Sequence, residues 1–203
     1  MTATVSAQRP VAAPASGQRD GFAGTGTLLR LALRRDRIMA TIWILLFVIM
    51  AASSSAASQD LYTTLESRVR AANAVNDTPA TLALYGRVFD PTSLGAVSLI
   101  KLGAMGAALV ALVAIFTVVR HTRAEEEAGR LELLGAAVVG RYASLTAALL
   151  LATGTSLVLA LLTGLSLIGT GLPVEGALAF GVSWAGAGIA FAAVGALAAQ
   201  VTE

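Results

Sequence analysis

The feature that most constrains the fold is a set of four long apolar stretches. Residues 38–58 carry no charged side chain, and about twenty helical residues, rising about 1.5 Å each, are enough to cross a hydrocarbon core of about 30 Å. Three comparable stretches follow at residues 95–119, 144–168 and 176–199. A helix satisfies its own backbone hydrogen bonds in lipid. The sequence therefore predicts an all-α membrane protein, a bundle of about four transmembrane helices.

The amino-acid composition agrees with a membrane protein and argues against several other classes of protein and site. Hydrophobic residues make up 56% of the chain and charged residues 13%, which is too apolar a balance for the surface of a soluble domain. The chain has no Cys, so disulfides, cysteine-based metal sites and thiol catalysis are excluded. A net charge of +2 is too small to indicate nucleic acid as a partner.

The distribution of arginine predicts how the bundle is oriented. The segment before the first span and the loop at residues 120–141 together hold ten arginines, whereas the other two loops hold three and none. The positive-inside rule then places the N-terminus and the 120–141 loop in the cytoplasm and residues 59–90 outside. Arginine outnumbers lysine thirteen to one, which is typical of a bacterial coding background, so we expect the bacterial plasma membrane as the location.

Two segments lie before the first span. Residues 1–26 are rich in Ala, Ser, Pro and Gly without an apolar period, which predicts a flexible cytoplasmic tail and not a signal peptide. Residues 27–37 place Arg30, Arg34 and Arg37 on one helical face, which predicts an amphipathic interface helix at the lipid surface. The alternative is a plain basic flank that orients the first span. Residues 27–203 are expected to form one transmembrane domain.

The external segment, residues 59–90, is predicted to be helical and amphipathic. Apolar residues recur there at helical spacing: Leu61, Leu65, Val69 and Ala72. A short second helix is expected at residues 78–85, because Pro79 suits its first turn and Gly86 its end. Asp90 and Pro91 then form a start signal for the helix of the second span.

Few residues inside the spans suggest chemistry. Lys101 fits either a side chain that reaches to the membrane interface or a part of a substrate path. Ser54 and Thr153 are further candidates for such a path. The fourth stretch is rich in glycine: Gly181, Gly186, Gly188 and Gly195. These glycines predict close helix packing, although glycine is common throughout the chain, and the two interpretations have equal weight.

The loop at residues 120–141 holds the densest charge. Glu125, Glu126 and Glu127 are consecutive, so on a helix they point about 100° apart and do not converge on a metal or catalytic site. Glu126 is spaced to pair with Arg130. A helix with charge on one side and leucines on another is typical of a helix that docks onto a partner. No phosphate-binding glycine loop and no nucleophilic triad occur in the sequence.

Two motifs carry a resemblance to a known family. The stretch EEEAGRLELL at residues 125–134, after a long second span, and LRLALRRDRI at residues 29–38, before the first, occur in this chain. In these motifs the chain resembles the membrane permease subunits of bacterial ATP-binding-cassette exporters of polyketide antibiotics, within the type-2 exporter permeases. Members of that family are longer, with two repeated sets of spans. The chain therefore looks like the N-terminal portion of such a permease.

The resemblance implies an exporter of apolar or amphipathic small molecules whose pre-span helix and loop helix contact a separate ATPase subunit, a homodimer that binds ATP and Mg. It implies coupling roles for these residues: Arg30, Arg34, Glu125, Glu126, Gly129, Arg130 and Glu132. This chain would bind no cofactor or metal and catalyse no reaction itself, and its other partners would be the bilayer, the remaining C-terminal spans and the substrate. The alternatives are a non-transporting scaffold that recruits a soluble partner through its loop and, less well supported, an intramembrane enzyme.

Overall fold

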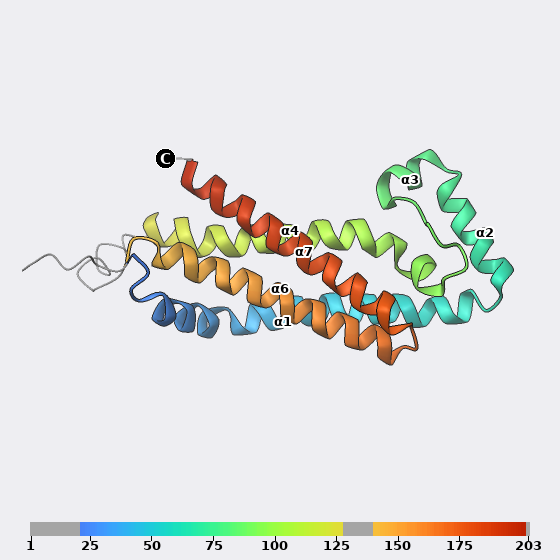
Figure 1. The fold of residues 1–203 in the computed structure, drawn as a ribbon, viewed down its shortest axis with the longest axis horizontal. Helices are drawn as coiled ribbons and strands as arrows, with labels where there is room; N and C mark the ends of the chain where they lie inside the picture. The colour runs from blue at the N-terminus through green and yellow to red at the C-terminus, as the bar shows by residue number, and fades with distance from the viewer. Residues whose placement is uncertain (1–20, 128–139, 202–203) are drawn as a thin grey trace, which may run out of the picture.

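The computed structural model describes residues 21–127 and 140–201, and all the regular elements in these ranges are α-helices. Four of them are long and lie side by side along the molecule, while two short ones gather at one end (Figure 1). The helices are α1 (Thr25–Leu61), α2 (Leu65–Asn76), α3 (Pro79–Tyr85), α4 (Leu94–Glu127), α6 (Ala143–Gly169) and α7 (Val174–Val201). The four long helices are long and apolar enough to cross a membrane. The predicted fold class is confirmed, and each predicted span lies within one of these helices.

Helix α1 joins two segments that the sequence treats separately. The predicted interface helix, residues 27–37, and the predicted first span, residues 38–58, both lie within one helix of 37 residues, Thr25–Leu61. No proline or glycine interrupts the chain between Thr27 and Leu61, so nothing breaks the hydrogen-bond ladder. The arginine-bearing turns are therefore helical as predicted, but they are the rigid beginning of α1 and not a separate element.

The glycines of α7 explain how this helix packs against α6 and α4. A Cβ atom at Gly181 would overlap the backbone carbonyl of Ala160, and one at Gly188 would overlap the hydroxyl of Ser156, both on α6. Gly195 would place a Cβ 3.3 Å from the Cα of Ile115 on α4. Gly186, in contrast, has nothing within 4 Å of the corresponding position. Close helix packing thus accounts for three of the four glycines, and Gly186 needs another explanation.

A tryptophan anchors the centre of the bundle. The Trp184 side chain on α7 is fully buried, and it lies against Gly106 of α4, where a Cβ atom would overlap the indole ring. The indole ring also contacts Phe47 of α1 edge-on, with ring centroids 5.5 Å apart. Three of the four long helices therefore meet at one aromatic side chain, which keeps their relative positions fixed along the middle of the bundle.

The two short helices form a lobe at one end of the molecule. Helix α2 begins with a reciprocal capping box between Thr64 and Ser67, so its start is set at Leu65 by hydrogen bonds and not by the apolar Leu61. Helix α3 ends as predicted at Gly86, whose φ of 82° is readily adopted by glycine. The Asn76 side chain then closes the lobe by two hydrogen bonds to the backbone of Val88.

The start of α4 differs from the prediction. Asp90 accepts hydrogen bonds from the hydroxyl and the backbone N–H of Thr92, at 2.6 and 3.0 Å, and these hydrogen bonds hold the pKa of Asp90 below its ordinary value. They stabilise a turn and not the helix end, because α4 begins at Leu94. The hydroxyl of Ser93 accepts from the N–H of Ala96 at 3.3 Å, so Ser93 performs the capping that the sequence assigned to Asp90.

Candidate functional site

A cavity of about 280 Å³ lies between α1, α4 and α6. Its wall is mainly apolar and includes Met39, Trp43 and Phe47 of α1, Val113 and Phe116 of α4, and Leu159 of α6. Phe116 and Trp43 are 67% and 37% exposed, so the cavity opens on the flank of the bundle. A space with a mainly apolar wall suits an apolar molecule.

Three hydroxyl groups contribute polar atoms to the cavity wall. Thr117 donates its hydroxyl proton to the carbonyl of Val113 at 2.8 Å, and Ser156 donates to the carbonyl of Ala152 at 2.8 Å. Thr155 likewise bonds to carbonyls of its own helix. Because each proton is already used within a helix, these hydroxyls can offer a ligand acceptor lone pairs and not donors.

Charged side chains close one end of the cavity. Asp36 of α1 lies between two residues of α4: its Oδ2 is 2.6 Å from His121 Nε2, and its Oδ1 is 3.2 Å from Arg120 Nη2. Asp36 and His121 are both buried. A buried carboxylate needs such partners, because removal from water destabilises the charged form. The cluster Asp36, Arg120 and His121, termed here the charged cluster, therefore joins α1 to α4 at this end.

Sequence reasoning missed the charged cluster. Asp36 stands alone among the arginines of residues 30–37, and His121 is the chain's single histidine. An isolated acid in a basic segment and an isolated histidine after a span were the available signals. The two residues are 85 positions apart, and nothing in either segment states that they face each other.

The residues predicted for a substrate path lie elsewhere. Ser54 donates a hydrogen bond of 2.9 Å to the carbonyl of Ser98 and so links α1 to α4. Lys101 is exposed on α4 and Thr153 is half-buried on α6. None of the three lines the cavity described above, and the structure does not bring them together, so their role in a substrate path stays a prediction.

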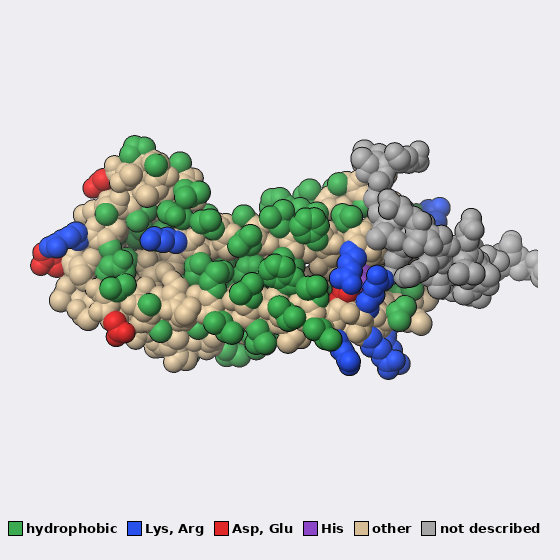
Figure 2. Space-filling model, turned by 180° about the vertical axis from the view of Figure 1, so that it is seen from behind, with side chains coloured by type: hydrophobic (Ala, Val, Ile, Leu, Met, Phe, Trp, Pro, Cys, Tyr) green, Lys and Arg blue, Asp and Glu red, His purple; other side chains and the backbone are tan. Residues whose placement is uncertain are grey.

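Four of the residues predicted to couple to an ATPase are described, and they lie at the end of the molecule that bears the charged cluster. Arg30 and Arg34 are exposed on α1, and Figure 2 shows several Lys and Arg side chains close together at this end. Glu125 and Glu126 fall in the last turn of α4. The other predicted coupling residues lie outside the described residues: Gly129, Arg130 and Glu132. Their coupling role therefore stays a prediction.

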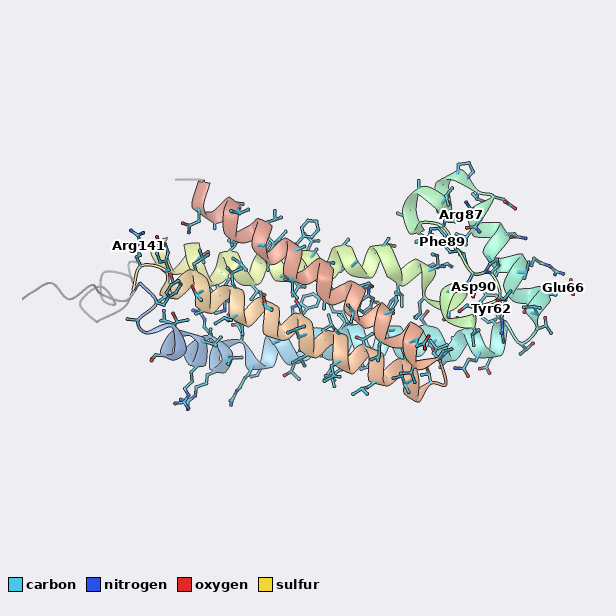
Figure 3. The ribbon with its side chains drawn as sticks, in the orientation of Figure 1. Tyr62, Glu66, Arg87, Phe89, Asp90 and Arg141 are labelled. Atoms are coloured by element: carbon cyan, nitrogen blue, oxygen red, sulfur yellow. The ribbon has the colours of Figure 1, made fainter. Side chains whose placement is uncertain are left out.

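The two ends of the molecule carry different structures. Figure 3 shows Tyr62, Glu66, Arg87, Phe89 and Asp90 in the lobe at one end and Arg141 at the opposite end, where the backbone of residues 140 and 142 bonds to residues 23 and 21. Among the described residues, no group of three or more His, Cys, Asp or Glu side chains could hold a metal ion. The cavity described above has a mainly apolar wall and one charged end.

Four helices of membrane-spanning length, three of which line an apolar cavity, define a polytopic membrane protein. The chain belongs to the family described as multidrug efflux system permease Rv1217c, C-terminal domain, which matches residues 26–202. It is 45% identical over 195 residues to the multidrug efflux system permease protein Rv1217c of Mycobacterium tuberculosis (strain ATCC 25618 / H37Rv). The resemblance to exporter permeases is thereby confirmed.

The match covers 96% of this chain and 35% of the relative, so the chain spans about a third of the length of the curated relative that it matches. The family description names a C-terminal domain, whereas the resemblance suggested an N-terminal portion. The position of this chain within a full-length permease stays a prediction.

Proposed function

We propose that the chain forms part of the membrane permease of an ATP-driven exporter, and that the cavity between α1, α4 and α6 holds the transported molecule. The transported class would be apolar or amphipathic small molecules such as antibiotics. The observation that carries the proposal is the cavity itself, with its apolar wall and its opening on the flank of the bundle. The family match and the relative's name, a multidrug efflux permease, support the same function.

The size and position of the cavity suit this role. Its volume of about 280 Å³ is close to the lower limit of about 300 Å³ for small-molecule pockets. A molecule dissolved in the bilayer could reach it between α1 and α4 without first entering water. The charged cluster at one end would then orient a molecule that has a polar group.

In this proposal the energy comes from a separate ATPase subunit, a homodimer that binds ATP and Mg. The arginine-rich end would face the cytoplasm, as the positive-inside rule favours, and the remaining spans of the permease would complete the transport pathway. Arg30 and Arg34 are exposed on the same long helix that lines the cavity. A shift of this helix on ATP binding would change access to the cavity, provided that the ATPase binds the two states with different affinity.

Filling the cavity tests the proposal. Ala40 lines the cavity on α1, whereas Ala57 is exposed on the same helix and does not line it. In the full-length permease, reconstituted with its ATPase in proteoliposomes, Ala40→Phe should abolish efflux of a dye substrate while assembly and basal ATP hydrolysis persist. Ala57→Phe should behave like the wild type. Normal efflux by the Ala40→Phe variant would contradict a substrate site in this cavity.

A second experiment tests coupling. Charge reversal at both Glu126 and Arg130 should weaken association with the ATPase in a detergent pull-down, if the loop helix docks onto that subunit. The matched control reverses the charges of Glu66 and Arg70, an exposed ion pair on α2 at the other end of the molecule. In this pair Arg70 Nη2 lies 2.6 Å from Glu66 Oε1. Equal ATPase recovery from both double variants would argue against the predicted coupling site.

A further inference from the structure

The two charged side chains at the end of the cavity, Asp36 and Arg120, differ in burial and in their hydrogen bonds. The Asp36 side chain is 10% exposed and the Arg120 side chain is 40% exposed. His121 holds Asp36 by Oδ2, whereas Oδ1, which lies near Arg120, accepts no hydrogen bond from any residue in the described ranges. The carboxylate is therefore fixed by His121, and at Oδ1 it has an ion pair with Arg120 but no hydrogen bond. The long arginine side chain can turn outward to water or lipid headgroups.

The remaining polar atoms of the cavity also favour a donor. The hydroxyls of Thr117, Thr155 and Ser156 have committed their protons to helix carbonyls, so they add acceptor lone pairs to the two oxygens of Asp36. Apart from Arg120 and the ring N–H of Trp43, the side chains that line the cavity offer no hydrogen-bond donor. A ligand group rich in donors would find partners here, and a group rich in acceptors would find few.

Aromatic rings complete the environment. Trp43 and Phe47 are stacked on α1 with ring centroids 6.2 Å apart, and Phe116 faces the same cavity from α4. The face of an aromatic ring attracts a cation, and the attraction grows where water is excluded. An apolar body can pack on these rings as well.

We propose that the cavity selects amphipathic molecules that carry a protonated amine, with the ammonium group at Oδ1 of Asp36 and the apolar body against Trp43, Phe47 and Phe116. This inference rests on the proposed function, because it takes the cavity as the substrate site. The ammonium group competes with Arg120 for the carboxylate, so binding displaces the guanidinium and loosens one of the contacts between α1 and α4. Asp36 is the specificity-determining residue, and Arg120 opposes binding.

Because Asp36 favours binding of an ammonium group and Arg120 opposes it, substitutions at the two residues should change amine affinity in opposite directions. Three probes of nearly equal size are compared: 1-naphthylmethylamine, the neutral 1-naphthylmethanol and the anionic 1-naphthoate. Binding is measured by calorimetry to the full-length permease in nanodiscs of zwitterionic lipid, at a pH where the amine is protonated. The amine should bind wild-type protein more tightly than the alcohol. Asp36→Asn should lower amine affinity by about tenfold or more, as expected for a hydrogen bond between charged groups.

The second variant keeps the test independent of folding defects. Arg120→Gln should raise amine affinity several-fold, which general damage to the bundle would not do. Both variants should leave alcohol affinity within about twofold of wild type, since the pair acts on the charge and not on the apolar body.

Three other binding results would each contradict a specific part of the proposal. If the alcohol binds as tightly as the amine and both variants are silent, selection for amines is wrong while the cavity remains a substrate site. If naphthoate binds most tightly and depends on Arg120, the selectivity is for anions and the proposal is overturned. If no probe binds and the Ala40→Phe variant transports normally, the proposed function fails together with this inference.

Discussion

Replacing Gly181 by alanine tests how the bundle is held together. The added methyl group would overlap the backbone carbonyl of Ala160 on α6, and a backbone atom cannot rotate away as a side chain can. The two helices would have to separate locally, which exposes the packed surface between them. Overpacking of this kind typically destabilises a protein by about 1 to 3 kcal/mol.

The matched control is Gly186→Ala on the same helix, where the added methyl group meets nothing within 4 Å. Both substitutions gain the same intrinsic helix propensity, about 1 kcal/mol in favour of alanine. The difference between the two variants removes this shared gain and isolates the cost of the clash at Gly181. For a cooperative unit of about 200 residues, that cost corresponds to a difference in Tm of roughly 2 to 12 °C.

The assay is thermal unfolding of both variants in the same detergent, followed by the loss of the monodisperse peak on size-exclusion chromatography. Gly186→Ala should melt at or slightly above the wild-type temperature and Gly181→Ala clearly below Gly186→Ala. Equal melting temperatures for the two variants would refute the reasoning, because they would mean that α6 and α7 do not approach as closely as described.

Three further predictions concern other parts of the chain. Thr64→Ala removes the capping box with Ser67 and should destabilise α2 by about 1 kcal/mol, which would appear as faster hydrogen exchange of the α2 amides; unchanged exchange would show that the cap contributes nothing. Ser54→Ala removes the hydrogen bond to α4 and should cost about 0.6 kcal/mol, whereas Ser53→Ala, whose hydroxyl bonds within its own helix, should leave the melting temperature unchanged. The chain has no Cys, so each of the variants Asp77→Cys and Thr27→Cys carries a single thiol. In intact cells a membrane-impermeant maleimide should label Asp77→Cys and should not label Thr27→Cys. The reverse labelling pattern would show that the predicted orientation is wrong.

The long helices could be predicted from the sequence because membrane length and hydrophobicity are properties of a single segment. Residues 144–168 and 176–199 are bounded within a few residues of α6 and α7. Local turn chemistry was also readable: Pro79 and Gly86 delimit α3 as expected. The continuity of α1 was missed, because a change from charged to apolar residues alters the surroundings of a helix and not its backbone.

The cavity and the charged cluster could not be predicted, because both depend on how separate helices are rotated against one another. Helix α7 is apolar on nearly all sides, so periodicity assigned it no inner face and could not separate Gly181 from Gly186. The pairing of Asp36 with His121 likewise needs the relative register of α1 and α4. Sequence alone offered charged or hydroxyl residues as candidates, and it had no means of knowing which of them share a space.

The uninterrupted course of α1 has a mechanical consequence. Its 37 residues make a rod of about 55 Å, well beyond the hydrocarbon thickness of about 30 Å. The first arginine-bearing turns, which carry Arg30 and Arg34, thus form an arm beyond the length needed to cross the hydrocarbon layer, and this arm is rigidly continuous with the cavity wall that carries Met39, Trp43 and Phe47. Because no hinge separates the arm from the wall, a sideways force on the arm would tilt the whole of α1. A displacement of the arm at the membrane surface would therefore change the width of the cavity.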